Sequence, residues 1–329
     1  MPSRRADSRV AAIIATMNRP AYVRDAITSA CEQTYGPLEV VIVDGSEDDR
    51  TAEVVADLRE SFPERSIMYF QNDTPQGLPA ARNQAVEATD AEYLAFLDDD
   101  DQWYTDKIAR QVAMFQSSPE DLALVHTGFV ALDDQGNQRF VHRPAYAPPA
   151  YQELLEENVI ATPSTVMVHR SRFEAVRGFD ETLRYCEDWD LYLRMARKYR
   201  VDYIHEPLVD HVHHDDAMTR DLDPFFAYRR RLLEKHDEAL RCHGMRRRAW
   251  VYHYELEGNR YLRAGAGSRS RSAYRKVLSL DPTPDNLVLC IVLHTLPATL
   301  AWPTLEWLGT VKNRMGARLR IGWMASPGQ

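Results

Sequence analysis

Cysteine is scarce in this chain, and the few cysteines lie far apart. The sequence of 329 residues contains 4 cysteines and no CxxC pair. Neither a zinc knuckle nor a disulfide framework is therefore expected, and a reducing compartment fits best. The cysteines are Cys31, Cys186, Cys242 and Cys290.

An excess of basic charge is also missing. Lys plus Arg number 40 against 49 Asp plus Glu, which gives a formal net charge of -9. This balance argues against a broad nucleic-acid-binding surface, although it is compatible with a local basic groove. The segment Met1 to Ser8 lacks the apolar run of a secretory signal, so we expect a cytoplasmic protein.

A long run without formal charge occurs near the carboxyl end. Leu287 to Leu305 is about as long as a membrane-spanning helix, which needs about 20 apolar residues, but prolines and a histidine interrupt it. Basic and apolar residues then follow up to Trp323, a pattern suited to an anionic lipid surface. A single crossing would place this basic tail outside, against the positive-inside tendency. We expect residues 287–323 to contact the cytoplasmic face of the membrane; the alternative is a helical hairpin packed on the protein.

The amino-terminal part alternates strand-like and helical patterns. Runs rich in Val, Ile and Leu with helical spacing between them are typical of βαβ units and a parallel sheet. After the first run, Asn18 is expected to cap a helix with Pro20 in its first turn. Ligands of such sheets bind at the carboxyl ends of the strands. The predicted strands are Val10 to Ala15, Leu38 to Val43, Ile67 to Gln71 and Tyr93 to Leu97, and further helices are Leu78 to Ala88 and Asp106 to Phe115.

The pattern changes in the second part of the chain. Leu122 to His142 predicts a hairpin whose turn lies at 134–137. After about Asp221 the chain is helical, and it contains one helical hairpin, too few units for a repeat array. The other predicted elements are strands at Ser164 to His169 and Val201 to His205 and a helix from Asp188 to Tyr199.

Four consecutive carboxylates, Asp98 to Asp101, follow directly on an apolar strand. Their mutual repulsion raises their pKa values, so the cluster is costly unless a cation neutralises it. Carboxylate oxygen suits Mg²⁺ or Mn²⁺, and Mg²⁺ is usually held by one or two carboxylates together with phosphate oxygens. A solvated turn is the alternative, but the position at a strand's carboxyl end favours a divalent-metal site.

A second acidic group, with Glu187 and Asp188 at its centre, opens a predicted helix. Acidic residues in a first helical turn are favoured by the helix dipole alone, which is the purely structural explanation. A carboxylate held at the edge of a cleft would equally serve as a general base, provided that it reaches the proton to be removed.

Taken in order, these and other segments resemble glycosyltransferase family 2, whose members are inverting enzymes with a GT-A nucleotide-diphospho-sugar transferase fold. The matches lie between about residues 9 and 215, and their common order makes them jointly specific. Two departures concern recognition of the base: Met17 replaces an aromatic residue, and Asp44-Gly45-Ser46 is one residue shorter than the usual form. The matching segments are Val10 to Arg19, Cys31 to Tyr35, Glu39 to Ser46, Gly77 to Asn83, Phe96 to Trp103, Gly178 to Glu181 and Glu187-Asp188.

The resemblance implies an α/β fold of the GT-A, Rossmann-like class, with a mixed, mainly parallel sheet flanked by helices. It implies a catalytic domain over 1–220, with a nucleotide-sugar-binding half at 9–103 and an acceptor-binding half at 104–220, and a helical extension over 221–329. The implied reaction is a metal-dependent, inverting transfer from a nucleotide-diphospho-sugar, with a UDP-sugar favoured. The implied acceptor is a saccharide, lipid-linked through a polyprenyl chain or part of a surface polysaccharide, and the implied cofactor is Mg²⁺ or Mn²⁺.

The resemblance also assigns roles to single residues. Asp188, with Glu187 beside it, would take the proton from the acceptor hydroxyl, and one in-line displacement would invert the anomeric configuration. Trp189 would pack under the acceptor or be a core residue. Metal ligands would be Asp100, Asp98 and a histidine, His213 or His214; a surface or phosphate-contacting role is the alternative for these histidines. The donor would be bound by Thr16, Asn18, Arg19, Asp44, Arg82, Asp98 and Asp99.

Two other functions are compatible with such a fold. A nucleotidyltransferase is expected to have a Gly-rich phosphate loop after its first strand, and Ala15 to Pro20 lacks one. A catalytically inactive binding protein would use the fold and the helical tail for partners. The presence of Asp98, Asp100 and Asp188 argues against it.

Overall fold

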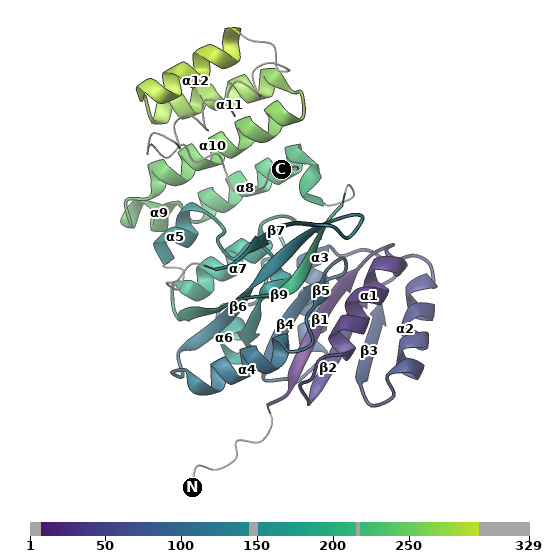
Figure 1. The fold of residues 1–329 in the computed structure, drawn as a ribbon. Helices are drawn as coiled ribbons and strands as arrows, with labels where there is room; N and C mark the ends of the chain where they lie inside the picture. The colour runs from purple at the N-terminus through teal and green to yellow at the C-terminus, as the bar shows by residue number, and fades with distance from the viewer. Residues whose placement is uncertain (1–7, 145–150, 215–217, 296–329) are drawn as a thin grey trace. The chain divides into compact units, whose positions relative to one another are not determined.

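The structure, a computed structural model, describes residues 8–144, 151–214 and 218–295, and within them nine strands form one mixed sheet (Figure 1). The chain divides into two compact units. Unit 1 comprises Met1–Leu154 and Asn158–Ala217, and unit 2 comprises Leu155–Glu157 and Met218–Gln329. The expected α/β class, with a mostly parallel sheet flanked by helices and a helical carboxyl-terminal part, is confirmed.

The first half of unit 1 is a parallel sheet in the order β3-β2-β1-β4. Strand β1 is buried along its whole length, as expected for a strand covered on both faces. Figure 1 shows α1 and α2 side by side, and α3 packs on β1 and β2. The four predicted strands are confirmed. The elements are β1 (Val10–Thr16), α1 (Pro20–Cys31), β2 (Leu38–Asp44), α2 (Arg50–Ser61), β3 (Ser66–Gln71), α3 (Leu78–Glu87) and β4 (Tyr93–Asp98).

Asn18 does not cap α1, contrary to the expectation. The N-cap residue is Arg19, and Asn18 has a positive φ of 59°. Asparagine tolerates this left-handed conformation better than most residues. The backbone N–H of Asn18 donates to Ser46 Oγ over 2.7 Å, and this bond ties the loop after β1 to the loop after β2.

The second half of unit 1 mixes strand directions. Strand β8 pairs antiparallel with both β4 and β6, whereas β9 pairs parallel with β6. The predicted hairpin is confirmed as β6 and β7. Strand β9 is longer than predicted because its pairing with β6 continues, with shifts of register, to His213. The elements are β5 (Gln102–Trp103), α4 (Lys107–Ser117), β6 (Leu122–Asp133), β7 (Gln138–His142), α5 (Tyr151–Glu156), η1 (Pro163–Thr165), β8 (Met167–His169), α6 (Arg170–Ala175), α7 (Glu187–Ala196) and β9 (Arg200–His213).

The carboxyl ends of β1, β2 and β4 lie at one edge of the sheet. In the pairing register Thr16 lies opposite Asp44, and Ala15 lies opposite Asp98. The four consecutive carboxylates Asp98 to Asp101 form a turn at the end of β4, here called the acidic turn. Strand β5 follows this turn and pairs with β9, so the turn is held between β4 and β9. Ligands of parallel sheets bind at such an edge.

Unit 2 is helical in its described part, and α10 with α11 forms the predicted hairpin. Gly258 allows the two helices to approach, because a Cβ there would lie 2.5 Å from Cε2 of Tyr274. Within the described residues, no helix is both long and apolar enough to cross a membrane. Most of segment 287–323 lies outside the described residues. The elements are η2 (Met218–Arg220), α8 (Leu222–Lys235), α9 (Asp237–Cys242), α10 (Arg246–Arg263), α11 (Gly267–Leu280) and α12 (Pro284–Thr295).

Candidate active site

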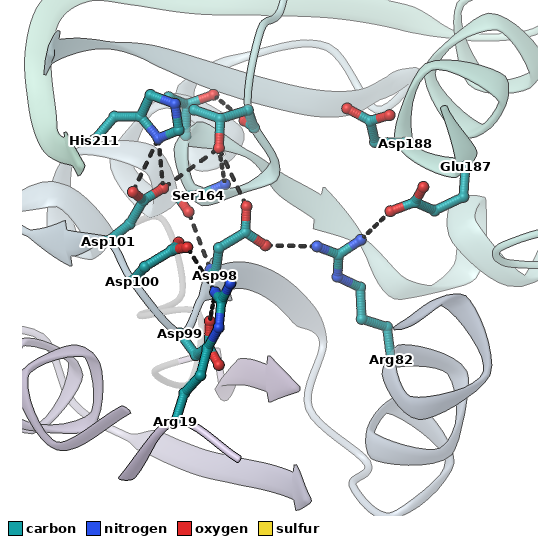
Figure 2. A network of polar contacts seen from close by, with 12 residues as sticks. Arg19, Arg82, Asp98, Asp99, Asp100, Asp101, Ser164, Glu187, Asp188 and His211 are labelled. Carbon is teal, nitrogen blue, oxygen red and sulfur yellow. Dashed lines mark hydrogen bonds and ion pairs between the residues drawn. The ribbon is translucent and has the colours of Figure 1, made fainter. Parts of the chain in front are cut away.

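Thr16 and Arg19 hold two of the four consecutive carboxylates. Thr16 Oγ1 donates to Asp99 over 2.7 Å. Arg19 Nη1 donates to Asp99 over 3.2 Å and to Asp100 over 3.0 Å, as Figure 2 shows. The structure therefore brings together predicted site residues from the loops after β1 and β4.

Arg82 on α3 joins the two acidic groups that lie far apart in the sequence (Figure 2). Its Nη2 donates to Asp98 Oδ1 over 2.5 Å, and its Nη1 donates to Glu187 Oε1 over 2.7 Å. The side chain of Arg82 is 3% exposed. Burial opposes its charge, but Asp98 and Glu187 outweigh burial and raise the pKa of Arg82. Asp188 lies beside Glu187 and acts on the same guanidinium, so the two motifs form one cluster.

Asp188 lies half-buried in the first turn of α7. Asn158 Nδ2 donates to its Oδ2 over 3.1 Å. Burial raises the pKa of Asp188, although the backbone N–H of Trp189 and the charge of Arg82 oppose the rise. Burial likewise raises the pKa of Glu187, to about 7, against the attraction of Arg82. Asn158 was not predicted, because a single asparagine in a loop carries no sequence signal.

Asp101 points toward His211 on β9 (Figure 2). It is fully buried, and its Oδ1 lies 2.9 Å from His211 Nδ1. Burial alone would lower the pKa of His211, but Asp101 raises it to about 9. Burial would also raise the pKa of Asp101, yet His211 and the hydrogen bonds from Ser164 and the backbone N–H of Val212 keep it below its usual value. The two groups form an ion pair that the sequence analysis did not predict.

His214 lies against the acidic turn, and His213 does not. His214 Nε2 is 2.7 Å from Asp100 Oδ2, and the ring of Tyr22 stacks on the imidazole with centroids 5.2 Å apart. His213 is exposed, and its ring lies beside Phe140 with centroids 6.3 Å apart. Side chains alternate along a strand, so the residue after His213, at the end of β9, points the other way. Of the two candidate histidines, the geometry favours His214.

Two carboxylates of the acidic turn, Asp98 and Asp99, have raised pKa values, because burial and mutual repulsion outweigh the neighbouring positive charges. Burial raises the pKa of Asp98 to about 6, although Arg82 opposes the rise. Burial, together with Asp100, raises the pKa of Asp99 to about 7. Within 8–144, 151–214 and 218–295, no group of three or more His, Cys, Asp or Glu is arranged to hold a metal ion as the side chains stand. Asp100 and His214 bind each other instead.

Asp44 is fully buried at the end of β2. Its Oδ1 accepts from both the N–H and the O–H of Ser46, and its Oδ2 accepts from the O–H of Tyr69 over 2.9 Å. Both carboxylate oxygens therefore have protein partners, and Asp44 fixes the loop that follows β2. Met17 lies beside this loop and is 49% exposed.

Trp189 is a core residue in this structure. Its side chain is among the largest fully buried ones, and its Nε1 donates to the carbonyl oxygen of Leu154 over 2.7 Å. Of the two interpretations of Trp189, this burial favours core packing over direct contact with an acceptor.

The sequence is similar to those of known glycosyltransferases. The profile described as "Glycosyl transferase family 2" matches residues 11–177. An uncharacterized glycosyltransferase of Rickettsia typhi is 27% identical over 220 residues, which are 64% of this chain and 65% of that protein. A putative teichuronic acid biosynthesis glycosyltransferase, TuaG of Bacillus subtilis, is 27% identical over 191 residues, 57% of this chain and 72% of that protein. The match thus spans less than two thirds of the Rickettsia relative.

Solved structures share the fold at low identity. TarS 1-349 of S. aureus in complex with UDP-GlcNAc has a TM-score of 0.60 and 16% identity over 95% of this chain and 93% of that chain. The mannosyltransferase PcManGT of Pyrobaculum calidifontis, in complex with GDP-Man and Mn²⁺, has a TM-score of 0.57 and 18% identity over 95% of this chain and 83% of that chain. At these identities the likeness establishes the fold.

Proposed function

The chain belongs to glycosyltransferase family 2, and on that premise we propose that it transfers a sugar from a nucleotide-diphospho-sugar to an acceptor hydroxyl with inversion of the anomeric configuration. The Arg82 bridge carries this proposal, because it joins the acidic turn at the sheet edge to the Glu187-Asp188 pair. A transfer reaction needs both groups in one place: one side stabilises the leaving phosphate while the other removes a proton.

The donor is proposed to bind at the carboxyl edge of β1, β2 and β4. Departure of the sugar leaves negative charge on the diphosphate, and charge-assisted hydrogen bonds from guanidinium groups stabilise such charge. Arg19 and Arg82 are two arginines bonded to the acidic turn. The complexes of similar proteins with UDP-GlcNAc and with GDP-Man support a nucleotide-sugar donor and make UDP and GDP the bases to test.

The residues of the acidic turn fit a divalent cation. Burial and repulsion hold the pKa values of Asp98 and Asp99 above their usual range, a cost that a cation would relieve. Asp98, Asp100 and His214 would hold Mg²⁺ or Mn²⁺: carboxylate oxygen is the ligand that both ions prefer, and imidazole nitrogen is a less favoured but possible ligand of Mn²⁺. When bound, such a cation supplies Lewis-acid stabilisation of the leaving diphosphate. The complex of a similar protein with Mn²⁺ supports this assignment.

Asp188 is proposed to be the general base. Its raised pKa makes it a stronger proton acceptor, and Asn158 and the start of α7 fix its orientation. Removal of the acceptor proton by such a base contributes typically about 10² to 10⁴-fold to the rate. Glu187 accepts from Arg82 and is buried behind it, so it is proposed as a positioning residue.

The acceptor is proposed to be a saccharide on a lipid carrier or a surface polysaccharide, at the cytoplasmic face of the membrane. The similarity to TuaG, a putative teichuronic acid biosynthesis glycosyltransferase, supports a polysaccharide acceptor. The basic and apolar residues within 287–323 support a membrane contact. Removal of residues 296–329, which leaves α12 in place, is expected to abolish sedimentation with anionic vesicles; unchanged sedimentation would contradict this contact.

A donor screen tests the proposed function. The purified chain is incubated with UDP-, GDP- and TDP-sugars in the presence of Mg²⁺, Mn²⁺ or EDTA, and donor hydrolysis and thermal stabilisation are measured. We expect one nucleotide-sugar to stabilise the protein and to be hydrolysed slowly only when a divalent cation is present. Release of pyrophosphate from a nucleoside triphosphate and a sugar phosphate would instead indicate a nucleotidyltransferase.

A further inference from the structure

Asp101 and His211 form a buried ion pair that the proposed reaction does not use. Asp101 is 0% exposed, and His211 Nδ1 lies 2.9 Å from its Oδ1 and 3.1 Å from its Oδ2. The backbone N–H of Val212 donates to the same Oδ1 over 3.1 Å. Since Asp101 has no exposed surface, any effect of this carboxylate on a ligand is exerted through its neighbours.

Asp101 connects three segments of unit 1. It lies in the turn after β4, it contacts His211 and Val212 on β9, and Thr162 Oγ1, at the start of η1, lies 3.4 Å from its Oδ2. Ser164 donates to Asp101 with its hydroxyl and accepts from the backbone N–H of Asp98 over 3.0 Å (Figure 2). The fourth carboxylate thus fixes the turn that carries the other three.

The end of β9 continues from this ion pair directly to His214. His214 Nε2 meets Asp100 Oδ2 over 2.7 Å. A strand rises about 3.3 Å per residue and its side chains alternate, so a slip of one residue at His211 would reverse the side chains and displace His214. The contact between Asp100 and His214 therefore depends on the register that Asp101 and His211 set.

We propose that the Asp101–His211 ion pair is a positioning device that fixes the register between the acidic turn and the end of β9, so that Asp100 and His214 meet at the metal site. This inference rests on the proposed function. Residues that orient metal ligands in this way typically change metal affinity by about 10 to 100-fold when they are replaced.

The test compares Asp101→Asn and His211→Gln with His205→Gln in the full chain. His205 is a matched control, because it lies on the same strand and contacts Pro144 O rather than the acidic turn. Mn²⁺ is titrated in the presence of UDP and, separately, of GDP, and free Mn²⁺ is followed by electron paramagnetic resonance. We expect about a tenfold or greater loss of Mn²⁺ affinity in the first two variants and less than about a twofold change in the control.

The outcomes separate this inference from the proposed function. If the wild-type chain binds no Mn²⁺ with either nucleotide, the proposed function fails and the inference fails with it. If the wild type binds Mn²⁺ and both folded variants bind it equally well, the inference alone is overturned, even where their unfolding temperatures fall. Should both charge-removing variants fail to fold, Ser164→Ala decides: it removes an uncharged donor to the Asp101 carboxylate together with the acceptor of the Asp98 N–H, and unchanged Mn²⁺ affinity would overturn the inference.

Discussion

The acidic edge of the sheet in unit 1 and the helical core of unit 2 both bury a histidine, with opposite results. At the sheet edge Asp101 raises the pKa of His211 to about 9 in spite of burial. In α10, burial lowers the pKa of His253 to about 2, and the cations Arg229, Arg230 and Lys276 lower it further. Neither ring nitrogen of His253 has a hydrogen-bond partner within the described residues, and Glu257 Oε2 lies 3.7 Å from Nε2.

Burial alone therefore does not decide whether a side chain is charged. Burial removes the charge of a histidine unless a carboxylate lies in hydrogen-bond contact with it. The sheet edge contains further contacts between a cation and a carboxylate, since Arg82 forms ion pairs with both Asp98 and Glu187. This edge therefore keeps charges that can act on a ligand, whereas His253 is a neutral packing residue.

Of the substitutions proposed, replacement of Arg82 by methionine is expected to destabilise the charged edge of the sheet most. The change leaves the buried Glu187 and the half-buried Asp98 without their cation, and breaking a buried pair in this way costs about 3–5 kcal/mol. We expect this loss in the free energy of unfolding, measured with urea at neutral pH. Arg24→Met breaks an exposed pair with Asp57 and is expected to cost less than about 1 kcal/mol. Equal losses in the two variants would mean that the edge does not depend on paired charge.

Asp188→Asn tests whether the carboxylate of Asp188 acts as the general base. The isosteric amide cannot accept the proton, so kcat is expected to fall by about 10² to 10⁴-fold while donor binding changes by less than about threefold. Asp57→Asn makes the same chemical change on α2 at an exposed position and is the control. Initial rates and nucleotide binding are measured on both variants. Loss of donor binding equal to the loss of rate would contradict the role of a base.

Acidification is expected to affect the two regions with opposite sign. The unfolded chain protonates His253 below its ordinary pKa of 6.5 and the folded chain does not, so unit 2 loses stability as the pH falls below 6.5. Glu187 has an ordinary pKa of 4.5, and its pKa in the folded chain is about 7. As the pH falls from about 7 to 4.5, the folded chain takes up this proton before the unfolded chain does, so the sheet edge gains stability. Between pH 6.5 and about pH 5 the His253 contribution is about 2 kcal/mol.

Hydrogen exchange followed by mass spectrometry checks this contrast, because it resolves peptides of α10 from peptides of β1. Protection of α10 is expected to fall on acidification while protection of β1 rises. His253→Phe should remove the pH dependence in α10 and leave β1 unchanged. A parallel fall in both regions of the wild-type chain would contradict the assignment of His253 as a neutral core residue.

The sheet edge was predictable from the sequence because its residues follow apolar strands directly. Asp44 and Asp98 end β2 and β4, and Thr16 ends β1, so strand prediction places all three at one edge. Asp188 was predictable from its place in a family motif, and Arg82 lies in another. These assignments need only local pattern and the rule for ligands of parallel sheets.

The direction in which each of four consecutive aspartates points was not predictable. It depends on where β9 and η1 pack, and β9 was predicted to end at His205 although it continues to His213. For the same reason the sequence did not distinguish His213 from His214 as a metal ligand, and the structure brings His214 to Asp100. Partners far away in sequence, such as Asn158 for Asp188, leave no periodic signal.

Tyr192→Phe is expected to change the free energy of unfolding least, and it tests a buried polar group of unit 1 that has no hydrogen-bond partner among the described residues. Tyr192 is 1% exposed, and its hydroxyl has no hydrogen-bond partner among the residues that the structure describes. A buried hydroxyl without a partner costs about 1–3 kcal/mol, so its removal is expected to leave the free energy of unfolding unchanged or to raise it by about 1 kcal/mol.

The matched control for this variant is Tyr69→Phe, because the hydroxyl of Tyr69 donates to Asp44 over 2.9 Å. Loss of a hydrogen bond to a charged group is expected to cost about 1.5–3 kcal/mol in urea unfolding. The opposite signs of the two changes would show that, at this edge, a polar group contributes to stability only where it has a partner. A loss of more than about 1 kcal/mol for Tyr192→Phe would mean that its hydroxyl is hydrogen-bonded in solution and that Tyr192 belongs to the paired groups of the edge.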